Sequence, residues 1–176
     1  MPPLAAPATD EMGRDNRAPG AIFEARRGRV PRGHRTVQAF YGEVIAISSQ
    51  NAETVRRAIA AINARDIDAY LVCCTENVEL LLPMAGSEYL GAHGVKRFFA
   101  DIEDIGPDFR TEVQRVQPIG DTTVLALLRV RATGRASGIV TAADSANVYD
   151  FIDGKMSRIR IFLDRGEALK AVGLEE

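Results

Sequence analysis

The sequence contains few of the residues that carry out metal, redox or nucleophilic chemistry. Its 176 residues include two histidines, His34 and His93, two adjacent cysteines, Cys73 and Cys74, and no tryptophan. Two histidines without a supporting carboxylate pattern exclude a histidine-rich metal site. Adjacent cysteines pair only with strain, and they lack the spacing of a zinc or redox motif. We therefore expect no metal, no bound cofactor and two reduced thiols, as in a cytoplasmic protein.

Glycine-rich phosphate loops, nucleophile elbows and long apolar runs are also missing. The chain has no loop of the Walker or dinucleotide type and no G-x-S-x-G turn. Its net charge is −2, so no overall field attracts it to nucleic acid or to a membrane surface. No apolar run is long enough to span a bilayer, and the N-terminus shows no secretory signal. Neither a membrane nor nucleic acid is expected as a partner.

The N-terminal stretch differs in composition from the rest of the chain. Residues 1–45 hold five of the eight prolines and seven arginines, but no lysine. Such a stretch cannot bury enough apolar surface to order itself. We expect residues 1–48 to be a disordered tail or a mis-annotated extension, although the apolar residues at 37–47 could pack on the domain formed by 49–176. The alternative is a basic arm that touches phosphate. Its residues would be Arg26, Arg27, Arg29, Arg32 and Arg35.

Three apolar stripes at helical spacing follow. The first helix is expected to begin at a cap near 49–51, and its stripe runs through 55–62. The second helix carries Tyr70, which is either an ordinary core residue or a hydroxyl that faces a cavity. The third stripe runs through 95–102 and includes Phe98. Arginine outnumbers lysine 19 to 3, which suggests a GC-rich bacterial genome.

The second half of the chain changes to a period of two, which is typical of strands. Strands are expected at 78–82, 110–116, 123–133, 139–152 and 156–163. Asp153-Gly154 suits a two-residue type I′ turn, and Asp164 with Glu167 forms a capping box for a short closing helix. Helices followed by long antiparallel strands predict an α+β fold, in which one curved, mostly antiparallel sheet carries three helices on its concave face.

The turn at Asp153-Gly154 also predicts how the last two strands pair. The pairs would be Val148 with Ile159, Ala146 with Ile161, and Asp144 with Leu163, all on one face. This apolar face should be the concave one. Asp144 would then lie beside an apolar wall, where desolvation raises the pKa of a carboxyl group and suits it to acid–base work. The alternatives are that Asp144 sits in water at the rim, or that a bulge between Ala146 and Asp150 turns Asn147 inward as a neutral donor for a ligand carbonyl.

Several motifs resemble a known family. They are RDIDAYL at 65–71, Leu82-Pro83, the Gly91 turn before VKRFF at 95–99, and DFIDGKMSRIRIFLDRGEAL at 150–169. Over about residues 50–174 the chain resembles the SnoaL-like branch of the nuclear-transport-factor-2-like superfamily, which includes ketosteroid isomerase, limonene epoxide hydrolase, scytalone dehydratase and polyketide cyclases. The resemblance implies a cone-shaped α+β barrel with a deep hydrophobic pocket, often dimeric through the outer face of its sheet.

The catalytic residues of two of these relatives have no counterpart here. Ketosteroid isomerase has a general-base aspartate just before the proline of its first strand, where this chain has Leu82. Its first-helix tyrosine falls at Ala58, and its protonated strand aspartate falls near Asn147. The last-strand aspartate of limonene epoxide hydrolase falls at Ile161. Neither leucine nor isoleucine can move a proton, so neither chemistry is expected.

Two functions remain open from the sequence. The first is a cofactor-free cyclase, isomerase or dehydratase for a hydrophobic steroid- or polyketide-like molecule, with Asp144 as acid or base and with Asn147 and Tyr70 as polar positioning groups. The second is a non-catalytic module that binds such a molecule or serves as a dimerisation scaffold. A homodimer is expected in either case. The expected pocket wall is Leu82, Phe98, Val148, Ile159, Ile161 and Leu163.

Overall fold

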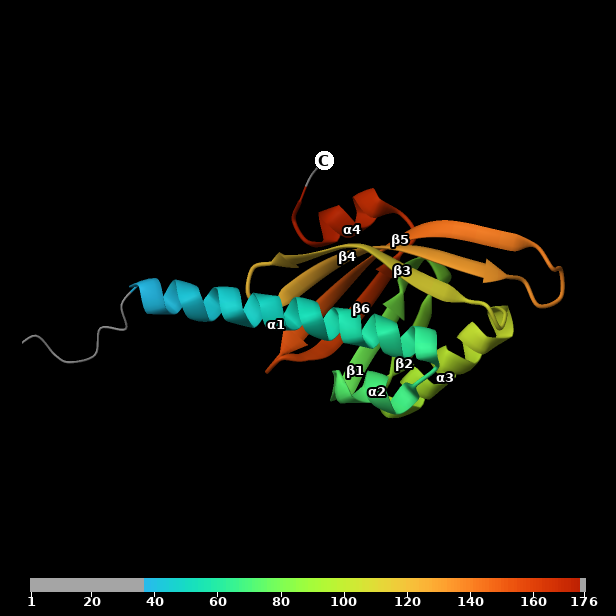
Figure 1. Cartoon of the computed structure of the whole chain (residues 1–176), viewed down its shortest axis with the longest axis horizontal. Helices are drawn as coiled ribbons and strands as arrows, with labels where there is room; N and C mark the ends of the chain where they lie inside the picture. The colour runs from blue at the N-terminus through green and yellow to red at the C-terminus, as the bar shows by residue number, and fades with distance from the viewer. Residues whose placement is uncertain (1–36, 175–176) are drawn as a thin grey trace, which may run out of the picture. The chain divides into compact units, whose positions relative to one another are not determined.

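The computed structural model describes residues 37–174, with side chains described from residue 46 onward. The arginine-rich arm and most of the expected N-terminal extension lie outside these residues, so the domain boundary at 48 stays a prediction. The elements are α1 (Val37–Ala64), α2 (Ile67–Val72), β1 (Cys74–Leu82), η1 (Pro83–Ala85), β2 (Ser87–Leu90), α3 (Gly91–Ile105), β3 (Arg110–Ile119), β4 (Thr123–Thr133), β5 (Val140–Ile152), β6 (Lys155–Phe162) and α4 (Arg165–Ala171) (Figure 1).

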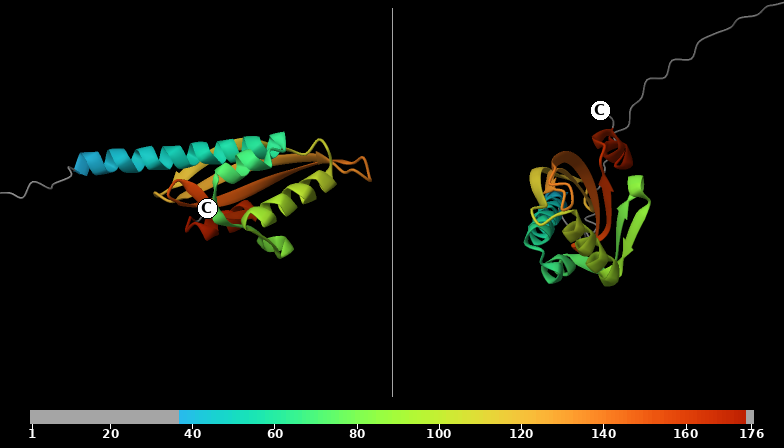
Figure 2. Two further views of the ribbon diagram at one scale, coloured as in Figure 1. Left: turned by 90° about the horizontal axis from the view of Figure 1, so that it is seen from below. Right: turned by 90° about the vertical axis from the view of Figure 1, so that its right-hand side faces the viewer.

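Six strands form one curved sheet in the order β2-β1-β6-β5-β4-β3. Neighbours pair antiparallel except β1 and β6, which pair in parallel. The helices α1, α2 and α3 lie on the concave side of the sheet, and α4 lies on the outer side against β5 and β6 (Figure 2). The predicted α+β fold is confirmed. None of the helices in the described part of the chain is long and apolar enough to cross a membrane.

Local signals account for several element ends. The Asp66 side chain caps α2 by accepting a hydrogen bond from the Ala69 N–H at 2.9 Å, and Asp164 caps α4 by accepting one from the Glu167 N–H at 2.9 Å. Asp153 and Gly154 have φ values of 50° and 74°, as a type I′ turn requires. One boundary was wrong: α1 begins at Val37, so residues 49–51, which were expected to cap it, lie inside the helix.

Two apolar clusters lie on the two faces of the sheet. The larger one fills the space between the helices and the concave face, and its fully buried members include Val55, Leu80, Phe99, Tyr149 and Ile159. The smaller one lies under α4 and contains Leu125, Ala146, Val148, Phe162 and Ala168. Because successive side chains of a strand point to opposite faces, the register of β5 decides which of its residues meet the helices.

The pairing of β5 with β6 corrects the expected register. Tyr149 lies opposite Ile159, and Asn147 lies opposite Ile161. Near the turn, Asp150 pairs with Arg158 while Phe151 pairs with Met156, so Ser157 is the extra residue of a β-bulge.

The bulge is anchored by the Ser157 hydroxyl, which donates to the Asp150 carbonyl at 3.1 Å. It shifts all pairs beyond it by one residue, which exchanges the two faces. The expected pairing of Val148 with Ile159 was therefore wrong. Asn147 turns inward, as the bulge alternative predicted, but the extra residue is Ser157 in β6 and does not lie between Ala146 and Asp150.

Candidate functional site

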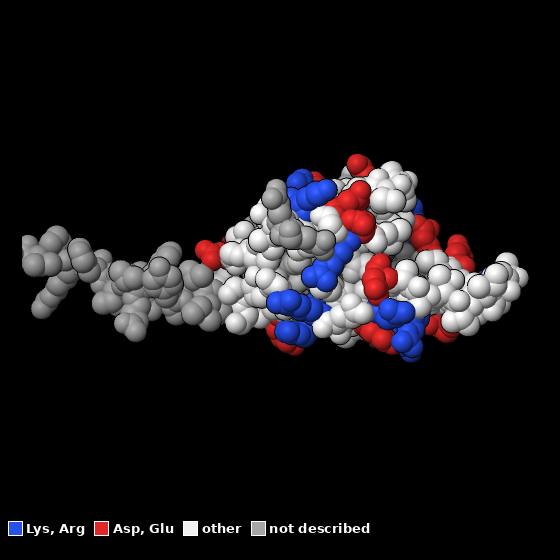
Figure 3. All heavy atoms as spheres, turned by 90° about the horizontal axis from the view of Figure 1, so that it is seen from above, with Lys and Arg blue, Asp and Glu red and all other residues white. Residues whose placement is uncertain are grey.

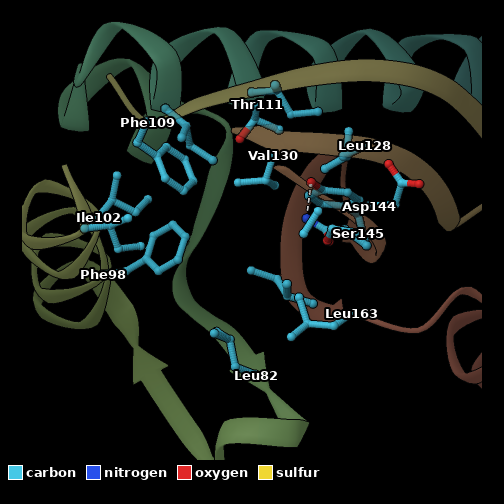
Figure 4. A pocket seen from close by; sticks show the side chains of 17 residues that line it. Leu82, Phe98, Ile102, Phe109, Thr111, Leu128, Val130, Asp144, Ser145 and Leu163 are labelled. Atoms are coloured by element: carbon cyan, nitrogen blue, oxygen red, sulfur yellow. Dashed lines mark hydrogen bonds between the residues drawn. The ribbon is translucent and has the colours of Figure 1, made fainter. Parts of the chain in front are cut away.

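A cavity of about 260 Å³ opens between the concave face of the sheet and the helices α1 and α3; we call it the main cavity (Figure 4). Most of its wall is aliphatic or aromatic. Its apolar members include Ile59, Ile62, Phe98, Ile102, Leu128 and Ile161. A concave site of this kind, with few polar groups, is the usual form of a small-molecule binding site.

The structure places four of the six expected wall residues in the main cavity: Leu82, Phe98, Ile161 and Leu163. Ile159 is buried in the core nearby but does not line the cavity. Val148 lies on the opposite face under α4. The one-residue shift at the Ser157 bulge explains its position, because it moves every even-numbered side chain of this part of β5 to the outer face.

Three polar side chains stand in a row along β5, at alternate positions that face the main cavity. We call Ser145, Asn147 and Tyr149 the polar strip. The Ser145 hydroxyl donates to Oδ1 of Asn147 at 2.7 Å, and Nδ2 of Asn147 donates to the Tyr149 hydroxyl at 3.2 Å. All three are buried. The polar strip is therefore a buried, hydrogen-bonded line of dipoles within an apolar wall, where each hydrogen bond is stronger than in water.

The phenol of Tyr149 is a weaker acid than an exposed tyrosine. Burial raises the pKa of Tyr149 to about 12, although the hydrogen bond from Asn147 partly opposes this rise. Burial also raises the pKa of Tyr70 well above its ordinary value. Both phenols are consequently neutral at physiological pH, and Tyr149 can serve the site as a hydrogen-bonding group but not as a base.

We expect Tyr70 and Tyr149 to ionise only as the protein unfolds in alkali. The unfolded chain ionises its tyrosines near pH 10, whereas folded Tyr149 resists to about pH 12. The contribution of these buried, neutral phenols to the free energy of unfolding is therefore fully present below pH 10. It is lost as the pH rises through about 12. An alkaline titration of wild type and of Tyr149→Phe tests this expectation. Absorbance at 295 nm reports tyrosine ionisation, and circular dichroism reports unfolding in the same samples. Reversible ionisation of all tyrosines near pH 10 with an unchanged fold would contradict it.

Asp144 lies at the rim of the main cavity rather than against an apolar wall. Its side chain is 67% exposed, and its Oδ1 accepts a hydrogen bond from Nη1 of Arg129 at 3.1 Å. Figure 4 shows its carboxylate directed away from the space between Phe98 and Leu163. The expected inward orientation was wrong, because the register places Asp144 with the outward residues of β5. Its role as an acid or base stays a prediction.

Tyr70 occupies the core rather than the cavity wall. It is 1% exposed and packs edge-to-face on Phe99, with 5.4 Å between the ring centroids. Of the two readings that the sequence left open, the structure shows the core position. Its proposed part as a positioning group in the site has no geometric support, because it is not among the residues that line the main cavity.

Sequence reasoning missed Ser145, Thr111 and Phe109 in the cavity wall. The Asn63 side chain holds Thr111 in place with two 2.8 Å hydrogen bonds to its backbone N–H and carbonyl. Arg65 donates to the Phe109 carbonyl at 3.2 Å, and its guanidinium lies 5.5 Å from the Phe109 ring centroid. These contacts join residues far apart in the chain, so only the correct parity of β5 could have indicated one of them, Ser145.

Metal and thiol chemistry find no support in the described residues. Among the side chains described, those of residues 46–174, no group of three or more His, Cys, Asp or Glu is arranged to hold a metal ion. Cys73 and Cys74 are both buried and unpaired with each other. Burial raises the pKa of the Cys74 thiol to about 12, so its nucleophilic thiolate is not accessible at neutral pH.

Comparison with known proteins identifies the fold. A family model described as a SnoaL-like domain matches residues 55–159. The comparison with curated proteins gives no match. An uncharacterised cystatin-fold protein from Novosphingobium aromaticivorans has a solved structure with 28% identity and a TM-score of 0.57; the match covers 64% of this chain and 97% of that one.

Two further solved structures share the fold at lower identity. An NTF2-like protein of unknown function from Burkholderia pseudomallei has 20% identity and a TM-score of 0.60, with 70% of this chain and 97% of that one covered. TerC, co-crystallised with polyporic acid, has 22% identity and a TM-score of 0.59, with 70% and 98% covered.

Proposed function

The chain belongs to the SnoaL-like family, and we propose that its main cavity binds an apolar small molecule that presents one neutral oxygen to the polar strip. The observation that carries this proposal is the contrast within one cavity wall. Aliphatic and aromatic side chains form most of the wall, and Ser145, Asn147 and Tyr149 form a single polar line across it. An apolar ligand buries its surface against the first set and is oriented by the second.

Asn147 is the residue best placed to receive the ligand oxygen. An asparagine amide carries two N–H donors, and the hydrogen bond to Tyr149 engages one of them. The second can donate to a ligand carbonyl. Ser145 holds the amide in this orientation by donating to its Oδ1, so the donor is fixed before the ligand arrives. The co-crystal of TerC with polyporic acid supports a small-molecule ligand in this fold.

The polar side chains that line the main cavity are better suited to binding a ligand than to acid–base catalysis. Among the described residues, the only carboxylate that lines the main cavity is Asp144, and it is exposed and paired with Arg129. A polarised carbonyl without a nearby base does not lose an α-proton. The homodimer and the cytoplasmic setting expected from the sequence stay predictions beside this proposal.

A pair of matched probes tests the proposal. The first is 2-acetylnaphthalene, and the second is 2-isopropenylnaphthalene, which has CH₂ in place of the carbonyl oxygen. We expect calorimetry to show that the ketone binds about tenfold more tightly, as one hydrogen bond to a buried donor provides. If neither probe binds, the main cavity is not a ligand site. If both bind equally, the polar strip does not recognise the oxygen.

The second candidate function is a cofactor-free isomerase or cyclase in which Asp144 is the base, and its position at the cavity rim favours it. Exchange of the methyl protons of 2-acetylnaphthalene in D₂O, followed by NMR, tests this. We expect wild type and Asp144→Asn to exchange the protons equally slowly and to bind the ketone within about twofold of each other, because an exposed ion pair contributes little. A wild-type acceleration that Asp144→Asn loses would establish the enzyme instead.

A further inference from the structure

A second apolar cavity, of about 240 Å³, adjoins the main one. We call it the distal cavity. Four residues line both cavities: Ile105, Phe109, Val130 and Ala143. Beyond this shared wall, the distal cavity continues along Ala132 and Thr141 towards the connection between β4 and β5. Figure 4 shows two of these residues, Phe109 and Val130, next to each other in the wall of the main cavity. The two cavities therefore lie next to each other along the concave face, with these four residues common to both walls; we call the pair the apolar track.

The polarity of this track changes from one end to the other. The inward side chains of β5 are polar at Tyr149, Asn147 and Ser145, and they become small at Ala143 and Thr141. Among the described residues, no lysine, arginine or histidine lines either cavity, and no ionisable side chain lines the distal one. A carboxylate or phosphate group placed against the buried polar strip would have no cationic partner, which is strongly unfavourable.

Hydrogen bonds near the end of α3 hold the wall of the distal cavity in place. The Thr133 N–H donates to Oδ1 of Asp108 at 2.8 Å, and the Arg135 N–H donates to the Ile105 carbonyl at 3.0 Å. These contacts tie the end of α3 to the end of β4. A wall that is formed before binding does not have to be ordered by the ligand, so these contacts would lower the entropic cost of filling the distal cavity.

We propose that one elongated, uncharged molecule occupies both cavities, with its oxygen at Asn147 and its apolar tail in the distal cavity. This inference rests on the proposed function, because it takes the oxygen site of the main cavity as given. It adds the ligand class: a ketone or alcohol with a long apolar chain, rather than a compact ring compound or an acid.

A series of methyl ketones from 2-hexanone to 2-tetradecanone measures the length of the site. We expect the affinity, measured by calorimetry below the solubility limit of each ketone, to rise about fourfold for each methylene that enters an apolar wall. The rise should continue after the main cavity is full. Dodecanoate should bind at least about tenfold more weakly than 2-dodecanone, because its charge has no partner.

Two tryptophan variants separate the distal cavity from the rest of the surface. Thr141→Trp fills the distal cavity, whereas Ala142→Trp places the same side chain one residue further along β5, on the other face opposite Arg131. Both positions are exposed, so both variants should fold. We expect Thr141→Trp to weaken 2-dodecanone at least about tenfold while 2-hexanone stays within twofold, and Ala142→Trp to change neither.

The outcomes distinguish this inference from the function on which it rests. If no ketone binds at any length, the proposed function itself fails. If 2-hexanone binds but longer ketones gain nothing, and Thr141→Trp leaves 2-dodecanone unchanged, the main cavity is the whole site and the inference is overturned. If dodecanoate binds as tightly as 2-dodecanone, the uncharged ligand class is wrong.

Discussion

Replacing Asn147 with leucine is expected to weaken the binding of 2-acetylnaphthalene by about ten- to a hundredfold. Leucine has nearly the same shape but no donor, so the ligand carbonyl would be buried without a partner. The Ser145 hydroxyl would also lose its acceptor, and the Tyr149 hydroxyl would lose the amide that donates to it. These lost bonds should lower the free energy of unfolding by about 1–3 kcal/mol. Calorimetry and urea denaturation measure the two effects separately.

The hydrocarbon probe is the control for this variant. 2-Isopropenylnaphthalene has no oxygen to pair, so its affinity for Asn147→Leu should be unchanged or higher than for wild type. A parallel loss for both probes would show that the substitution damages the shape of the main cavity. In that case Asn147 would be a packing residue, and the polar strip would have no part in recognition.

Replacing Phe99 with alanine is expected to lower the free energy of unfolding by about 3–5 kcal/mol. Phe99 is 1% exposed, and its ring packs edge-to-face on Tyr70 and Phe98, with centroid distances of 5.4 and 6.1 Å. Its removal leaves a cavity. It also removes two aromatic contacts, one with Tyr70 of α2 and one with Phe98 of α3. Urea denaturation monitored by circular dichroism gives the size of the effect.

Val72→Ala provides the matched comparison for this stability prediction. Val72 ends α2 and is 70% exposed, so its truncation should change the stability by less than about 0.5 kcal/mol. If Phe99→Ala were as mild as Val72→Ala, the aromatic cluster would not be part of the stabilising core. The placement of Tyr70 as a core residue would then also be in question.

Signals that act over a few residues were sufficient to predict most of the elements. The predictions of these elements used the stripe through residues 55–62, the caps at Asp66 and Asp164, and the Asp153-Gly154 turn. Each of these signals depends on side chains within about two helical turns or one hairpin. They led to the α+β fold and to the family resemblance, both of which are confirmed. Local chemistry of this kind can be read from a single sequence because the interacting groups are neighbours in it.

The candidate site was harder to predict because it depends on which face of a strand is inward. A shift of one residue exchanges the two faces. No sequence signal around Ser157 predicts the extra residue that causes this shift. The expectation for Asp144 therefore placed an exposed, ion-paired carboxylate inside the cavity, while the buried Ser145 was overlooked. The distal cavity depends on contacts such as that between Asp108 and Thr133, which join segments on different elements.

The bulge at Ser157 determines which residues of β5 and β6 share a face of the sheet. Without the extra residue, the inward side chains of β6, Ile159 and Ile161, would share a face with Ala146 and Val148 instead of Asn147. One of the two strands would have to rotate, and the cavity would lose either its polar strip or its aliphatic wall. A single-residue insertion or deletion in this hairpin would thus change which side chains face the pocket, although the sequence of β5 and β6 would otherwise be the same. Relatives should therefore be compared by the length of this hairpin before they are compared by residue identity.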